Sequence, residues 1–212
     1  MKIVFATGNK GKLREAAQIL GPGFELLCPA DLGIYDDIEE TGATLEENSV
    51  IKAEFIYQKT GLNCFADDTG LEVDALGGAP GVHSARYAVE VATRNGDLEL
   101  ASHADHDFGA NIDALLSELA KCPGAPRTAR FRSVVTLIWN GEKHFFEGSF
   151  EGRIAESRSG ANGFGYDPVF IADACPDHTV AELPDSFKND HSHRAKALKE
   201  MAAWLAQASA QI

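Results

Sequence analysis

Residues 2–20 read KIVFATGNKGKLREAAQIL. The first six are mostly β-branched or aromatic, which favours a strand. Apolar residues then recur at Leu13, Ala16, Ala17 and Leu20, a spacing typical of one face of a helix. Glycine and asparagine at positions 8 and 9 separate the two patterns. The stretch therefore predicts a strand, a tight loop and a helix, the repeating unit of an α/β fold.

The rest of the chain predicts more strands and helices and then a hairpin. We expect strands over residues 25–28, 63–66, 127–139 and 142–150, and helices over residues 44–60, 108–119 and 193–207. Thr44-Leu45-Glu46-Glu47 matches a capping box, and Asn140-Gly141 is typical of a two-residue hairpin turn. Together these elements predict an α/β fold with a mixed β-sheet flanked by helices, in one domain over residues 1–212 with two lobes.

Composition restricts the classes of partner. The 212 residues include 32 Asp and Glu against 19 Lys and Arg, a net charge of −13. Such a surface repels phosphate backbones and anionic lipid, so we expect no nucleic-acid and no membrane partner. The N-terminal apolar run is too short for a signal peptide, and the four scattered cysteines form no CxxC pair. We therefore expect a cytoplasmic protein with one sizeable core.

The segment Thr7-Gly8-Asn9-Lys10-Gly11-Lys12 lies where the first strand gives way to the first helix. Free backbone N–H groups, the helix dipole and two lysines would all face one anion there, as in a phosphate-binding loop. It is not a Walker A loop, because Leu13 rather than Ser or Thr follows Lys12. An ordinary strand-helix turn with solvated lysines is the alternative interpretation.

Acidic residues provide a second candidate site. Asp67 and Asp68 follow an apolar strand, where carboxylates suit a hard cation such as Mg²⁺. Neighbouring strand residues point to opposite faces, so only one of the two would enter a given site. Glu40 would supply a second carboxylate. A solvated turn at residues 67–70 and a solvated acidic loop at residues 39–40 are the alternatives.

Two later segments suit a planar ligand with phosphate groups. Glycines alternate with aromatic residues in Asn162-Gly163-Phe164-Gly165-Tyr166-Asp167-Pro168, which lets ring faces and backbone amides approach a ligand closely. Lys188 and Ser192-His193-Arg194 precede the last predicted helix and place cations near its N-terminus. A rigid turn with both rings in the core, and ordinary surface charge, are the alternatives.

Taken together, these segments resemble the inosine triphosphate pyrophosphatase family, also called Ham1-like or non-canonical purine NTP pyrophosphatases. The matching pieces, in the family's order, are residues 7–12, Glu40-Thr41-Gly42, Glu46-Glu47-Asn48, Lys52, residues 66–71 (ADDTGL), 75–81 (ALGGAPG), 84–87 (SARY), 163–168 (GFGYDP) and 192–194 (SHR). They span nearly the whole chain. Two departures are Thr69, where serine is common, and the stretch at residues 95–110, which is longer and more polar than the family pattern.

The resemblance implies a two-lobed subunit with a deep central cleft, a Mg²⁺ cofactor and a homodimer. It also implies hydrolysis of ITP, dITP and XTP to the monophosphate and pyrophosphate, which keeps deaminated purines out of nucleic acids. By the same resemblance, Glu40 and Asp68 bind the metal ion and Asp68 is the catalytic proton acceptor. The substrate-binding residues that it implies are Thr7, Gly8, Asn9, Lys10, Gly11, Lys12, Lys52, Thr69, Phe164, Gly165, Tyr166, Asp167, Lys188, His193 and Arg194.

Selectivity for a 6-oxo purine would come from donors aimed at that oxygen, with Arg194, His193 or backbone amides as candidates. Tyr166 and Phe164 would offer a stacking face for the base. Two other functions remain open. One is a related Maf-like pyrophosphatase acting on modified or pyrimidine triphosphates, and the other is a catalytically silent nucleotide-binding protein.

Overall fold

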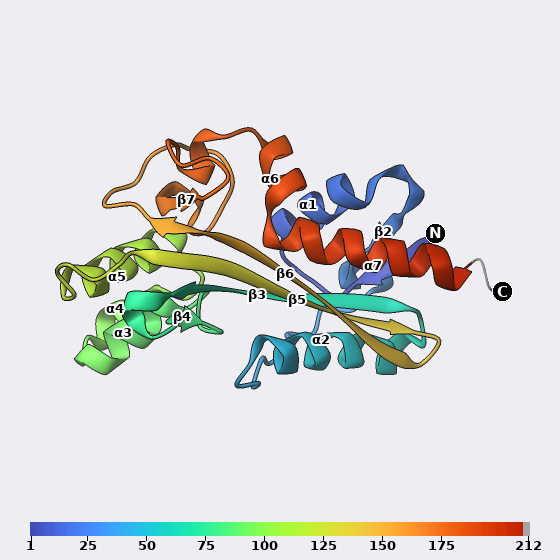
Figure 1. The fold of residues 1–212 in the computed structure, drawn as a ribbon. Coiled ribbons are helices and arrows are strands. Elements are labelled where there is room, and N and C mark those ends of the chain that lie inside the picture. The colour runs from blue at the N-terminus through green and yellow to red at the C-terminus, as the bar shows by residue number, and fades with distance from the viewer. Residues whose placement is uncertain (210–212) are drawn as a thin grey trace. The chain divides into compact units, whose positions relative to one another are not determined.

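The computed structural model describes residues 1–209, and these contain a seven-stranded sheet of order β2-β1-β3-β5-β6-β7, with β4 paired to β3 (Figure 1). The strands are β1 (Lys2–Phe5), β2 (Glu25–Leu27), β3 (Cys64–Val73), β4 (Pro80–Gly81), β5 (Thr128–Trp139), β6 (Glu142–Ile154) and β7 (Phe170–Ala172). The helices are α1 (Lys10–Leu20), α2 (Leu45–Thr60), α3 (Tyr87–Asn95), α4 (Leu98–His103), α5 (Phe108–Ala120), α6 (Asp185–His191) and α7 (His193–Ser209). Strand β1 is parallel to β2 and β3, whereas β4 and β7 are antiparallel to their neighbours. The predicted mixed α/β sheet is confirmed.

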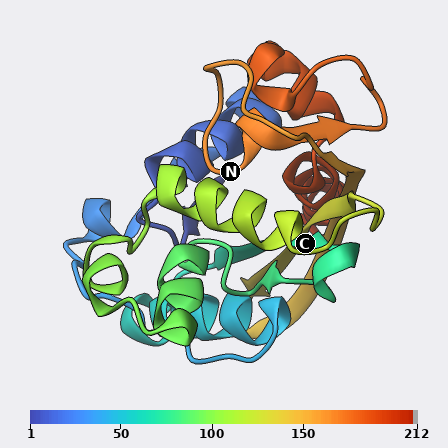
Figure 2. The same cartoon turned by 90° about the vertical axis from the view of Figure 1, so that its left-hand side faces the viewer.

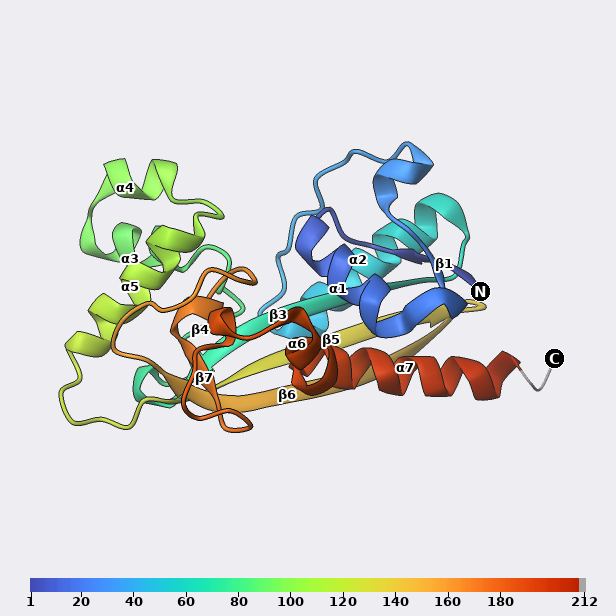
Figure 3. The ribbon, with the colours of Figure 1, turned by 90° about the horizontal axis from the view of Figure 1, so that it is seen from above.

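The chain divides into two compact units. Unit 1 comprises Met1–Asp68, Ser133–Ser149 and Asn189–Ile212, and unit 2 comprises Thr69–Arg132 and Phe150–Lys188. Strands β3, β5 and β6 contribute residues to both units (Figure 3). The assignment of residues 1–212 to one domain stays a prediction. No helix within residues 1–209 combines the length and the apolar character needed to cross a bilayer.

Unit 1 has three layers, because successive residues of β1 face opposite sides of the sheet. Ile3 and Phe5 pack with one cluster that includes residues of α1 and α7, such as Ala16 and Leu198. Val4 packs with the opposite cluster, to which α2 contributes. Figure 1 shows α2 on one side of these strands and α1 with α7 on the other. This layering places the loop before α1 at the carboxyl end of β1, next to β3.

Unit 2 has its own core. Tyr87 of α3 and Leu115 of α5 pack with the sheet residues Leu71, Phe131 and Phe170. Helices α3, α4 and α5 lie together, in green in Figure 2, and contact one another through α3. The polar stretch at residues 95–110 forms the end of α3, all of α4 and the start of α5.

Most predicted boundaries agree with the structure to within a few residues. Helix α1 spans the predicted residues, Thr44 caps α2, and Gly61 ends it in a left-handed conformation. The hairpin turns at Asn140-Gly141, where both residues have positive φ, as a two-residue turn of this kind requires.

The predicted end of the third strand was wrong. Strand β3 does not stop at Ala66 but continues through both aspartates to Val73, and Asp67 and Asp68 are buried. A solvated turn at residues 67–70 is thereby excluded. The strand tolerates two carboxylates because each one has a cationic partner from another element, as described below. The pattern of apolar residues also failed to predict α3, α4 and α6.

Candidate active site

The loop between β1 and α1 is organised by its own side chains. Asn9 caps α1: its Oδ1 accepts hydrogen bonds from the amides of Gly11 (2.9 Å) and Lys12 (3.1 Å). The Asn9 amide in turn donates to Thr7 Oγ1 at 3.1 Å. Three of the amides expected to face an anion are therefore already bonded. Within residues 1–209 the amides of Gly8 and Lys10 have no such partner, so these two are the donors left for a ligand.

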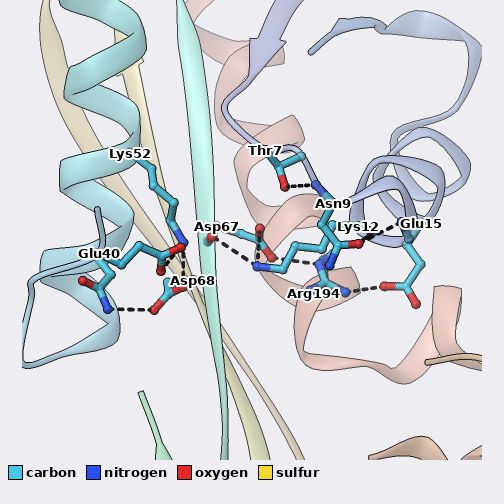
Figure 4. A network of polar contacts seen from close by, with 11 residues as sticks. Thr7, Asn9, Lys12, Glu15, Glu40, Lys52, Asp67, Asp68 and Arg194 are labelled. Carbon is cyan, nitrogen blue, oxygen red and sulfur yellow. Dashed lines mark hydrogen bonds and ion pairs between the residues drawn. The ribbon is translucent and has the colours of Figure 1, made fainter. Parts of the chain in front are cut away.

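Asp67 lies at the centre of a buried ion network (Figure 4). Its Oδ1 is 3.0 Å from Lys12 Nζ, and its Oδ2 accepts a hydrogen bond from Arg194 Nε at 2.9 Å. Arg194 also donates a hydrogen bond to Glu15, a buried residue of α1. Burial opposes ionisation of Asp67, but Lys12 and Arg194 outweigh it and hold the pKa of this carboxyl well below its usual range. Asp67 is thus a fixed negative charge that orients two cations.

Asp68 has different partners from those of Asp67, as the alternation of a strand requires. Its Oδ1 accepts a hydrogen bond from Lys52 Nζ at 2.6 Å, and the same ammonium donates to Glu40 Oε2 at 3.0 Å (Figure 4). Burial raises the pKa of Asp68 despite the attraction of Lys52. Burial also favours a higher pKa for Glu40, but the attraction and the hydrogen bond of Lys52 outweigh it, so the pKa of Glu40 is lowered. Two acidic residues 28 positions apart in the chain therefore share one cation.

Asn48 links the segment that carries Glu40 to the strand that carries Asp68. Its Oδ1 accepts from the Gly42 amide at 2.8 Å, and its Nδ2 lies 3.5 Å from Asp68 Oδ2. A Cβ on Gly42 would lie 2.6 Å from Asn48 Oδ1, so only glycine allows this approach. The Ala43 amide donates to Glu47 Oε2 at 2.6 Å and fixes the same segment to the start of α2. No role was predicted for Asn48 from the sequence, although it lies in a motif of the resemblance.

A second cluster lies in unit 2 around Asp167. Asp167 Oδ2 accepts hydrogen bonds from the Phe164 amide (2.9 Å) and from Lys188 Nζ (2.8 Å). The Lys188 ammonium is 4.7 Å from the centre of the Phe164 ring, a cation–π distance. Gly163 and Gly165 both have positive φ, which the tight turn requires. The cluster therefore presents one half-buried ring beside one cation.

Several residues lie deeper than the sequence indicated. Arg194 is 2% exposed, so the interpretation of residues 192–194 as surface charge was wrong. Tyr166 is buried in the core of unit 2, and its hydroxyl donates a hydrogen bond to Ser84 O at 2.9 Å, whereas Phe164 is only half-buried.

Lys188 lies inside α6, and His193 is buried at the start of α7. Thr69 follows Asp68 in β3 and is half-buried.

The ion pairs around Asp67 and Asp68 form one cluster in unit 1, and its charges are compatible with a metal ion that is bound together with a substrate. Lys12, Lys52 and Arg194 oppose four carboxylates, those of Glu15, Glu40, Asp67 and Asp68. The described residues contain no group of three or more His, Cys, Asp or Glu side chains arranged to hold a metal ion. Mg²⁺ fits such a place nevertheless, since it is commonly held by one or two carboxylates together with water and substrate phosphates. Glu40 and Asp68 are the oxygen donors available for it.

Comparison with known proteins gives a consistent result over nearly the full chain. A model described as the Ham1 family matches residues 3–204. The dITP/XTP pyrophosphatase of Porphyromonas gingivalis is 47% identical over 206 residues, which are 96% of this chain and 97% of that protein. The dITP/XTP pyrophosphatase of Bacillus subtilis is 44% identical over 204 residues, 95% of this chain and 96% of that protein.

Solved structures agree with these sequence matches. A HAM1 protein from Coxiella burnetii superposes with a TM-score of 0.83 at 35% identity, covering 98% of this chain and 99% of that one. The Ham1 protein of Staphylococcus aureus gives a TM-score of 0.81, also at 35% identity, with the same coverage.

Proposed function

The chain belongs to the Ham1 family, and on that basis we propose that it is a nucleoside triphosphate pyrophosphatase that acts on ITP, dITP and XTP. It breaks the anhydride bond between the α- and β-phosphates and releases the nucleoside monophosphate and pyrophosphate. Deaminated purines are thereby removed before they enter nucleic acids. The observation that carries the proposal is that Lys52 contacts both Glu40 and Asp68. The neighbouring strand residue, Asp67, forms an ion pair with Lys12 and so orients it.

We propose that Mg²⁺ is the cofactor, held by Glu40 and Asp68. When bound, it would neutralise phosphate oxygens and lower the pKa of a coordinated water. The four carboxylates of the cluster exceed its three cations by one charge, which would repel a triphosphate in the absence of such an ion. The oxygen donors of the cluster are of the class that Mg²⁺ prefers.

The protein's own groups would perform the remaining steps. Asp68 would accept a proton from the attacking water, since it is buried and its pKa is raised. Lys10, Lys12 and the amides of Gly8 and Lys10 would offset the charge that grows on the departing pyrophosphate. Thr7, Asn9 and Gly11 would hold the loop in shape. Asp67 keeps Lys12 in place, because the ion pair fixes its ammonium.

We propose that Phe164 stacks on the purine, which would contribute about 1–3 kcal/mol to binding. Gly165 and Asp167 would support this ring, and Lys188 lies over its face. Thr69, Tyr166 and His193 remain proposed substrate-binding residues, with Tyr166 acting from the core. Arg194 is proposed to act on the substrate mainly through Asp67, which it contacts directly.

Release of pyrophosphate from ITP, dITP, XTP, GTP and UTP, measured with and without Mg²⁺, tests the proposed function. We expect Mg²⁺-dependent turnover of the first three and much slower turnover of GTP. Preference for UTP would favour a Maf-like activity, and binding of ITP without turnover would favour a silent nucleotide-binding protein. We further propose a cytoplasmic homodimer, and light scattering on the purified chain of 22.7 kDa should then give about twice that mass.

A further inference from the structure

The ammonium group of Lys52 lies between the two carboxylates that the proposed function assigns to the metal ion. It is 2.6 Å from Asp68 Oδ1 and 3.0 Å from Glu40 Oε2, and the Lys52 side chain is 9% exposed (Figure 4). Both contacts have the lengths of charge-assisted hydrogen bonds. One cation therefore bridges Glu40 and Asp68.

A divalent ion that bound the same two carboxylate oxygens could not share this position with the ammonium. Mg²⁺ requires oxygen atoms at about 2.0–2.1 Å in near-octahedral geometry. Lys52 Nζ already contacts one oxygen of each carboxylate, and two cations this close repel each other strongly in a buried site. Binding of the metal ion to these two oxygens would therefore require that Lys52 gives up at least one of its two contacts.

We propose that Lys52 is a positioning residue that holds Glu40 and Asp68 together until substrate arrives and then transfers its charge to the triphosphate, so that metal ion and nucleotide bind as a coupled pair. Without a polyphosphate, the displaced ammonium would lose its carboxylate partners in a largely buried position. With a triphosphate bound, phosphate oxygens replace those partners. This inference rests on the proposed function for the identity of the nucleotide.

Coupling of this kind is reciprocal. If the nucleotide strengthens metal binding by a certain factor, the metal ion must strengthen nucleotide binding by the same factor. Removing the Lys52 charge should therefore have two opposite effects. It should strengthen binding of a divalent ion to the free protein, and it should weaken the coupling between the ion and the nucleotide.

Mn²⁺ binding, measured by electron paramagnetic resonance, tests the proposal without any turnover. Wild-type protein should bind Mn²⁺ weakly by itself and at least tenfold more tightly with α,β-methylene-ITP. Lys52→Met should bind Mn²⁺ at least tenfold more tightly than wild type in the absence of nucleotide, and the analogue should then add about threefold or less. Lys52→Arg keeps the charge and should behave like wild type.

Lys59→Met is a matched control, because Lys59 also lies on α2 and pairs with an aspartate, Asp36, at 2.6 Å on the exposed surface. It should leave Mn²⁺ affinity unchanged. Glu40→Gln added to Lys52→Met should abolish the gain, which shows that the ion uses this site. Circular dichroism checks folding, and Lys52→Gln replaces Lys52→Met if the latter does not fold.

The proposal is overturned if folded Lys52→Met or Lys52→Gln binds Mn²⁺ no more tightly than wild type in the absence of nucleotide. It is also overturned if the nucleotide analogue strengthens Mn²⁺ binding equally in wild type and in the variant. Pyrophosphate release from ITP by wild-type protein is measured separately. Loss of that activity alone would reject the proposed function and leave the metal-binding result for Lys52 intact.

Discussion

At the scale of single residues, two neighbouring aspartates of β3 have separate tasks. Asp67 is locked between Lys12 and Arg194, whereas Asp68 faces Lys52 and the Glu40 segment. The sequence predicted that only one of them would enter a given site, from the alternation of strand residues alone. It did not predict the partners, because Arg194 lies 127 positions from Asp67 and no local pattern reports such a contact. Glu15 escaped notice for the same reason.

Asp68→Asn should reduce kcat for ITP by about 10²–10⁴-fold, the usual contribution of a general base. KM should change little, because the amide keeps the size of the side chain. Steady-state kinetics with Mg²⁺-ITP provides the measurement. A variant that retains a near-wild-type rate would remove Asp68 from the mechanism.

Glu15→Ala should lower the free energy of unfolding by about 3–5 kcal/mol, since it leaves the buried Arg194 guanidinium with one carboxylate fewer. Urea unfolding at neutral pH measures the change. Glu25→Ala is the control: Glu25 pairs with Lys2 on the exposed surface, and such pairs contribute about 0–1 kcal/mol. Equal losses in the two variants would contradict a special role for the buried pair.

Acid should destabilise the protein through Asp67. The pKa of Asp67 is held down in the folded state, so its contribution to stability is fully present above the unfolded pKa of about 3.9 and is lost as the pH falls toward the folded value. The free energy of unfolding should therefore decrease as the pH is lowered below about 5. Asp67→Asn should be less stable at neutral pH and should show a shallower decrease, measured by urea unfolding at several pH values.

At the scale of elements, predictions succeeded where local chemistry determines the structure and failed where distant partners do. Thr44 and Gly61 bound α2 as the capping rules require. The predicted third strand ended too early, at Ala66, because two adjacent carboxylates normally indicate a solvent-exposed segment. The pairing of each with a cation from another element could not be predicted from the local sequence. Helix α6 is short and polar at its start, which resembles a loop.

Gly42→Ala should displace the segment that carries Glu40. The added Cβ would lie 2.6 Å from Asn48 Oδ1 and 2.7 Å from Glu47 Cβ, so the segment or the start of α2 must move. We expect weaker Mn²⁺ binding in the presence of nucleotide analogue and a clear loss of kcat/KM. Gly23→Ala is the control, since a Cβ there meets no atom within 4 Å. Unchanged Mn²⁺ affinity in Gly42→Ala would show that the segment does not position the metal ligand.

At the scale of the whole molecule, each unit has its own core and its own cluster of candidate residues. Unit 1 carries the ion networks of Asp67 and Asp68, and unit 2 carries Phe164, Asp167 and Lys188. The deep cleft implied by the resemblance stays a prediction. The sequence matches extend over both units, because the family model covers residues 3–204.

Binding of Mg²⁺ with α,β-methylene-ITP should raise the melting temperature, because a ligand that binds only the folded state adds about 2.7 kcal/mol at 100 times its Kd. Either component alone should have a much smaller effect if the two bind as a coupled pair. Differential scanning fluorimetry with each component and with both makes the comparison. Additive effects of the two components would contradict the coupling.

The alternation of β3 also makes its spacing more critical than the identity of its side chains. Asp67 and Asp68 reach different partners because they are neighbours in one extended strand, and the side chains of neighbouring strand residues point to opposite faces of the sheet. Insertion of a single residue between Cys64 and Asp67 would move Asp67 into the place of Asp68 and bring Ala66 opposite Lys12 and Arg194. The cations Lys12 and Arg194 would then lose their shared carboxylate, although every charged group of the site would still be present.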